Sequence, residues 1–107
     1  MKRGSIVAVA LQGDFGKART ALVIQSDMFD QHPTVSILAL SSEIVDAPLI
    51  RIDVSPTEPN GLHAVSQIAV DKIFTVSREK IGTLIGELEE DTLLAVNRAL
   101  LVFLGIA

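Results

Sequence analysis

The chain has 107 residues, no cysteine and a formal net charge of −4. Its length predicts one domain covering residues 1–107, and its lack of cysteine excludes disulfides and thiolate metal sites. Because nucleic-acid-binding domains are usually basic, an anionic ligand would have to be bound by a local cluster of cations, not by the charge of the whole chain.

The first predicted element is a strand over residues 5–11, where the sequence reads SIVAVAL. The apolar run ends at Gln12 without a clear cleavage site for a signal peptide. No stretch of the chain reaches the roughly 18 apolar residues that would span a bilayer. We therefore expect a soluble, cytoplasmic protein with no membrane contact.

Residues 20–25 predict a second strand, and Gly13 and Gly16 predict a hairpin with a medium-length loop between the two strands. Residues 26–33 predict a turn or a single helical turn that Pro33 closes. Alternating or β-rich patterns predict three further strands, over residues 34–40, 49–54 and 66–76.

The last part of the chain predicts two helices. Residues 77–88, SREKIGTLIGEL, predict one short helix weakened by its two glycines. Residues 89–104 predict a longer helix, because the apolar residues recur at helical spacing and Gly105 suits the position after a helix end. Leu94, Leu101 and Leu104 widen its apolar surface. Either deep packing on the sheet or contact with a partner subunit would explain this surface.

Strands dominate the first 76 residues, and the short connections between them argue against parallel crossovers. The expected fold is therefore α+β: a small antiparallel, barrel-like sheet with short helices and a C-terminal helix.

The most distinctive chemical feature is a pair of cations in GDFGKART, residues 13–20. Lys17 and Arg19 lie two positions apart, so both side chains would point the same way on an extended backbone. The planar guanidinium of Arg19 suits a phosphate, and Phe15 is the phenylalanine that we expect to be exposed. The simpler alternative is a solvated hairpin with surface cations.

The sequence offers few residues for metal binding, cofactor binding or stacking on bases. His32 and His63 lie in predicted loops with no cysteine nearby, so we expect no zinc site, although an acid–base pair of histidines stays open. The chain has neither a phosphate-binding P-loop nor a dinucleotide fingerprint, and we expect no cofactor. Tryptophan and tyrosine are absent, which leaves few side chains for stacking on bases.

Five segments, in the same order and nearly from end to end, resemble the MazF/PemK family of toxin–antitoxin endoribonucleases. These segments are MKRGSIV, GKARTALVIQSD, VSILALSSE, PNGLHAVSQIAVDKIFTV and AVNRALLVFLGIA. The resemblance implies an SH3-like barrel that forms homodimers and cleaves single-stranded RNA, commonly mRNA, without a metal. The products would carry 2′,3′-cyclic phosphate and 5′-OH ends. The resemblance also implies a cognate antitoxin whose disordered acidic segment folds across the RNA groove.

The family's arginine falls on Arg19, its strand-end threonine on Ser41 and its acidic residue on Asp71. The resemblance thus implies that Arg19 holds the scissile phosphate and that Ser41 hydrogen-bonds a phosphate oxygen or the 2′-OH. Asp71 would position a base or the nucleophile, or else be a structural carboxylate paired with Lys72 or Arg78.

The RNA-binding residues that we expect are Lys17, Phe15 and Lys72. The sequence also departs from the family pattern. Some members have an arginine two positions before the acid, where this chain has Ala69, and Thr20 replaces the proline that usually follows the arginine.

Two other functions stay open. The CcdB-like poisons of DNA gyrase share the fold and resemble this chain at a C-terminal Trp-Gly-Ile. Here that triplet is Leu104-Gly105-Ile106, without the tryptophan. The other alternative is a catalytically silent binding module that keeps the toxin fold.

Overall fold

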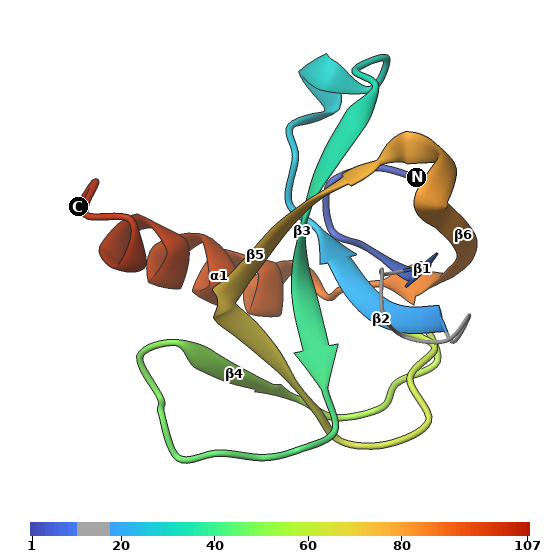
Figure 1. Ribbon diagram of the computed structural model, residues 1–107. Helices are drawn as coiled ribbons and strands as arrows, with labels where there is room; N and C mark the ends of the chain where they lie inside the picture. The colour runs from blue at the N-terminus through green and yellow to red at the C-terminus, as the bar shows by residue number, and fades with distance from the viewer. Residues whose placement is uncertain (11–17) are drawn as a thin grey trace.

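The computed structural model describes residues 1–10 and 18–107 of the chain. Within these residues the chain forms strands, two short 3₁₀ helices (η1 and η2) and a C-terminal α-helix (Figure 1). In chain order the elements are β1 (Ser5–Ala10), β2 (Ala18–Val23), η1 (Asp27–Phe29), β3 (Thr34–Ser41), β4 (Arg51–Val54), β5 (Ser66–Ser77), η2 (Arg78–Lys80), β6 (Ile81–Glu87) and α1 (Glu90–Phe103).

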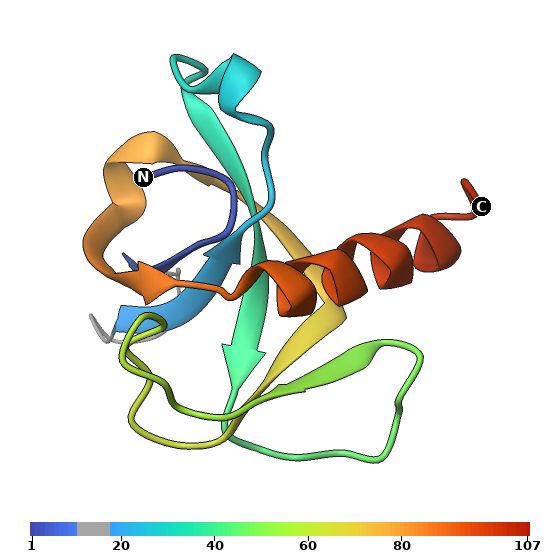
Figure 2. The same ribbon diagram turned by 180° about the vertical axis from the view of Figure 1, so that it is seen from behind.

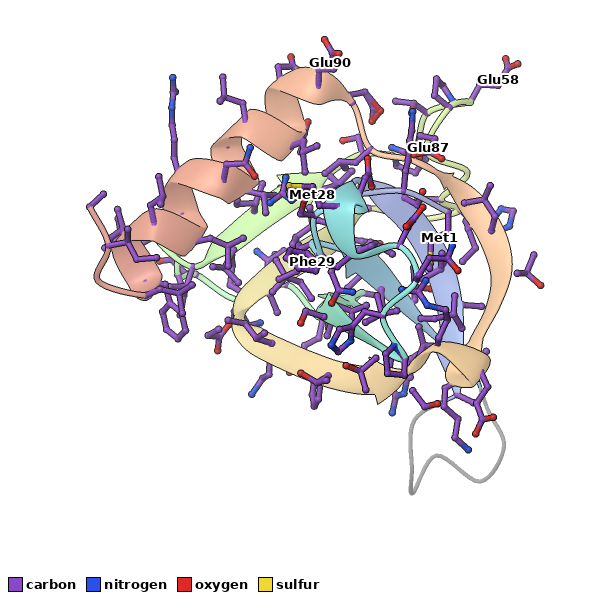
Figure 3. All side chains as sticks on the ribbon, turned by 90° about the horizontal axis from the view of Figure 1, so that it is seen from above. Met1, Met28, Phe29, Glu58, Glu87 and Glu90 are labelled. Carbon is purple, nitrogen blue, oxygen red and sulfur yellow. The ribbon has the colours of Figure 1, made fainter. Side chains whose placement is uncertain are left out.

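The strands form one sheet in the order β4-β5-β3-β2-β1-β6, and each neighbouring pair is antiparallel. This arrangement confirms the α+β prediction and the predicted first hairpin, in which Ala10 pairs with Ala18. Among the described residues, β4 and β6 end the sheet and do not pair with each other. The sheet bends so strongly that β5 and β6 curve around the strands between them, which makes it barrel-like but open (Figure 3).

The prediction of a helix over residues 77–88 was wrong. Only Arg78–Lys80 form a 3₁₀ turn, and Ile81–Glu87 form strand β6, which pairs with β1. Two facts explain the difference: β1 has a free edge to pair with, and glycine is a poor helix former. Gly86 also lies so close to the loop before β5 that an added Cβ would be 2.3 Å from the Asn60 carbonyl oxygen.

Two hydrophobic clusters fill the two faces of the sheet. Neighbouring residues of a strand point to opposite faces, so Leu38 belongs to one cluster and Ile37 to the other. Helix α1 crosses the face that contains Leu38 and buries Val96 and Leu100 against it (Figure 2). The opposite face carries the Ile37 cluster and continues into the candidate site.

The loop before β5 is held by Asn60, which is completely buried. Its Oδ1 accepts hydrogen bonds from the N–H groups of Thr57 and Leu62, and its Nδ2 donates to the Ser55 carbonyl and to Glu89. The NGL segment that contributed to the family resemblance therefore has a structural role here.

Helix α1 starts over the sheet and extends past its edge, so its C-terminal end projects from the body of the molecule (Figures 1 and 2). The helix ends as predicted, because Gly105 adopts a positive φ of 75° after Leu104. Apolar side chains at this end are exposed: Leu101, Val102, Phe103, Leu104 and Ile106. No helix within the described residues has the length and apolar character needed to cross a membrane.

Candidate functional site

The candidate site is a broad groove whose floor is made of alanines. Cross-strand pairs place Arg51, Ala69, Ala39 and Ala21 in one row across β4, β5, β3 and β2. Residues paired in this way point to the same face of a sheet. Ala69 and Ala39 of this row line the groove, where their methyl groups fill little space, and the groove has a volume of about 1340 Å³.

The groove concentrates positive charge in a chain that is negative as a whole. Of the nine lysines and arginines in the sequence, four line the groove, whereas Glu43 is its one acidic lining residue in the described part of the chain. The four cations are Arg19, Arg51, Lys72 and Lys80. This local excess is the cationic cluster that an anionic ligand would require.

Arg19 and Ser41 lie on the same face of neighbouring strands. Ala21 pairs with Ala39, and Arg19 and Ser41 are each two residues from that pair, toward the same end of the sheet. Both residues line the groove, and the Arg19 side chain is exposed. The Oγ of Ser41 accepts a hydrogen bond of 3.0 Å from the Glu43 N–H, which fixes the hydroxyl at the start of the loop after β3. The structure thus brings together two of the predicted site residues.

Asp71 forms an ion pair with Arg51 on β4. The Nε of Arg51 donates to Oδ1 at 2.9 Å, and Nη2 donates to Oδ2 at 3.3 Å. These bonds are the main cause of the lowered pKa of Asp71, which burial opposes. The suggestion that a structural Asp71 would pair with Lys72 or Arg78 named the wrong partners. Arg78 donates to the backbone carbonyls of His32 and Phe29.

An irregularity in β5 explains the positions of Asp71 and Lys72. Leu38 pairs with Ile73 but the next residue, Ala39, pairs with Ala69, so residues 70–72 form a bulge. A bulge bends its strand and redirects its side chains. Lys72 lines the groove, while Asp71 contacts Arg51. Arg51 is also the cross-strand partner of Ala69.

Two predicted RNA-binding residues, Phe15 and Lys17, lie outside the described residues. The expectation that Phe15 is the exposed phenylalanine was too narrow, because Phe29, Phe74 and Phe103 are all exposed. Phe74 lines the groove on β5, so an aromatic ring is present in the site. Its position after the bulge could not be read from the strand pattern.

The histidines lie away from the groove lining. His32 accepts a hydrogen bond from the Thr34 N–H, and His63 is exposed. Within residues 1–10 and 18–107, no group of three histidines, aspartates or glutamates is placed to hold a metal ion.

The fold and the groove define a small α+β domain with an open, barrel-like sheet and a cationic groove. Residues 2–104 match the family described as PemK-like, MazF-like toxin of type II toxin–antitoxin systems. The chain therefore belongs to this family. Over 108 aligned residues it is 43% identical to the probable endoribonuclease MazF of Mycolicibacterium smegmatis, and the match covers 100% of this chain and 99% of that protein.

Solved structures share the fold at lower sequence identity. An endoribonuclease in complex with its cognate antitoxin, from a mycobacterial species, has a TM-score of 0.84 at 22% identity and covers 100% of this chain and 97% of its own. The Mycobacterium tuberculosis toxin MazF-mt6 has a TM-score of 0.80 at 20% identity, with 94% and 96% covered. A MazE–MazF complex from Deinococcus radiodurans also scores 0.80, at 18% identity, with 100% and 97% covered.

Proposed function

We propose that this MazF-like toxin cleaves single-stranded RNA, without a metal, in the groove formed by β2, β3 and β5. The observation that carries the proposal is the placement of Arg19 and Ser41 on one face of neighbouring strands, at a groove whose charged lining residues are mainly cations. The 43% identity to a probable endoribonuclease over the whole chain supports the same activity. The family match favours it over gyrase poisoning.

The proposed reaction is attack of a ribose 2′-oxygen on the adjacent phosphorus. The 2′-OH loses its proton as the new P–O bond forms, the P–O5′ bond breaks, and the 5′-oxygen takes up a proton. The products are a 2′,3′-cyclic phosphate and a 5′-OH. The Arg19 guanidinium stabilises the charge that develops on the phosphate oxygens, and the Ser41 hydroxyl hydrogen-bonds a phosphate oxygen or the 2′-OH.

The remaining predicted residues would bind and orient RNA. Lys72 on the bulge and Lys17 attract the phosphate backbone, and Phe15 contacts a base. Asp71 serves as a positioning residue that acts through Arg51, because its lowered pKa makes it a weak proton acceptor.

We propose that two copies of the chain associate through the projecting end of α1. Residues 99–107 contain no charged or polar side chain, yet most of them are exposed. A two-fold interface brings the same surface of both copies together, and a projecting apolar helix end is a surface that gains by such contact. A second copy would remove this surface from water.

The proposed second partner is an antitoxin with a disordered acidic segment. Such a segment supplies the negative charge that the four groove cations would otherwise find on RNA, and it folds on binding. Two of the similar solved structures are complexes of this kind. One contains an endoribonuclease with its cognate antitoxin, and the other contains MazF with MazE. We further propose that the 107 residues act as one domain in the cytoplasm.

The test is to incubate the purified protein with single-stranded RNA of mixed sequence in the presence of a chelator. We expect cleavage products with cyclic phosphate and 5′-OH ends. A parallel reaction contains gyrase and supercoiled DNA. Trapped gyrase–DNA complexes without RNA cleavage would support the gyrase alternative, and the absence of both results would support a silent binding module.

A further inference from the structure

Arg51 forms the wall of the groove opposite Arg19. It stands on β4, with β5 and β3 between it and β2. Three strand spacings of roughly 4.8 Å separate the two backbones by about 14 Å. Its side chain is only 14% exposed, and what is exposed lines the groove.

The ion pair with Asp71 uses one edge of the Arg51 guanidinium. Arginine has five N–H donors, and Nε and Nη2 each give one to the carboxylate. Both donors of Nη1 and the second donor of Nη2 have no protein partner among the residues that the structure describes. These donors form the end of the guanidinium, which is the edge that binds two oxygens of a phosphate.

We propose that Arg51 binds a second RNA phosphate, distinct from the scissile phosphate at Arg19. The proposal rests on the proposed ribonuclease function and adds a binding residue to it. Asp71 holds the Nε edge of the guanidinium and thereby directs its free end into the groove. The RNA backbone then crosses the alanine floor from Arg19 to Arg51, and small side chains are needed there because larger ones would obstruct its path.

A purely structural ion pair would explain the same contacts, but it would predict different binding behaviour. Partly exposed pairs contribute little to stability, and a buried pair can often be replaced by apolar residues without loss. A structural pair is disrupted equally by removing either partner. A phosphate-binding arginine is affected mainly by removing the arginine. The variants Arg51→Ala and Asp71→Asn therefore distinguish the two roles.

The experiment measures binding of a random-sequence pool of 2′-O-methyl oligonucleotides, which lack the attacking hydroxyl and are not cleaved. Fluorescence anisotropy at several salt concentrations gives the slope of log K against log salt. Each phosphate contact with a single strand contributes about 0.7 to this slope. We expect Arg51→Ala to lower the slope by about 0.7 and to weaken binding about tenfold or more.

Two further variants accompany this one. Asp71→Asn removes the carboxylate that orients the guanidinium but keeps the cation, so we expect its slope to fall by clearly less than that of Arg51→Ala. Lys2→Ala removes an exposed cation that does not line the groove and should leave the slope unchanged. Circular dichroism confirms that each variant is folded before binding is measured.

The outcomes separate this inference from the function on which it rests. An Arg51→Ala slope equal to the wild-type slope overturns the inference, even if the wild-type protein cleaves RNA. Equal losses in Arg51→Ala and Asp71→Asn also overturn it, because they indicate a structural pair. A wild-type protein that binds the pool without cleaving natural RNA contradicts only the nuclease. If the wild-type protein neither binds nor cleaves, both proposals are wrong.

Discussion

The groove and the projecting end of α1 are both exposed, but they are built from opposite kinds of residue. The groove has alanines in its floor and is lined by four cations, of which Arg51 is held in place by hydrogen bonds to Asp71. The helix end carries no charge over residues 99–107 and exposes large apolar side chains. Each surface is poorly suited to the ligand of the other.

The difference shows how one small domain of net charge −4 can present two separate binding surfaces. Charge that is concentrated locally attracts an anion even when the whole chain repels it. An uncharged helix end loses little electrostatic free energy when it leaves water, and burying it is favourable. The substitutions below test whether the two surfaces act separately.

The largest effect is expected from Arg19→Ala in the groove. Loss of a group that stabilises charge in the transition state lowers the cleavage rate by at least about 100-fold. The thermal midpoint should stay near the wild-type value, because the side chain is exposed. Rates are measured on the mixed RNA substrate. Full cleavage by this variant would exclude Arg19 from the mechanism.

A comparable effect on the other surface is expected from Phe103→Asp at the helix end. A carboxylate buried in an apolar interface is strongly unfavourable, so the dimer dissociation constant should rise by at least about 100-fold. Sedimentation would show wild-type protein at twice the 11.4 kDa chain mass and the variant at the chain mass.

Met28→Asp is the matched control for this substitution, because Met28 is 86% exposed on η1, outside both surfaces. It should leave the mass of the dimer unchanged. A wild-type protein that sediments as a monomer would contradict the assignment of the helix end to a second copy.

A smaller effect is expected from Ser41→Ala. The variant loses a hydrogen bond to a charged phosphate, which lowers cleavage about tenfold. Ser41→Thr keeps the hydroxyl and should retain most of the activity. The comparison is made at saturating RNA, and equal rates for wild type and Ser41→Ala would show that this hydroxyl takes no part.

The smallest effect concerns the ion pair at the wall of the groove. The pKa of Asp71 is lowered in the folded protein. The ion pair therefore stabilises the fold when the pH is above the ordinary pKa of an aspartate, and this contribution is lost as the pH falls through the folded pKa. Urea unfolding should show wild type more stable than Asp71→Asn by at most about 1 kcal/mol at pH 7.

This difference should be constant between pH 7 and about pH 5, and it should shrink below about pH 4. A difference that is the same at pH 7 and pH 3 would show that the carboxylate contributes nothing to folding through its charge.

Part of the proposed site could be anticipated from the sequence. Arg19 stands out as a cation where a loop meets a predicted strand, whereas Ser41 was assigned from the family resemblance. A hairpin plus one neighbouring strand brings the two residues together. Arg51 and Phe74 were missed for a different reason. Arg51 faces the groove because β4 pairs with β5, not with β3, its predecessor in the chain. Phe74 faces it because of a bulge that no local pattern predicts.

The sequence by itself determined the α+β composition, the antiparallel pairing, the C-terminal helix and the family resemblance, because periodicity, capping and short connections act between residues close in the chain. The tertiary structure decided what depends on distant neighbours. Residues 81–87 became a strand because the edge of β1 was available. Asp71 forms its ion pair with Arg51, 20 residues earlier in the chain, because β4 lies beside β5 in the sheet. Such pairings are settled only when the whole sheet assembles, since each strand position depends on the order of the others.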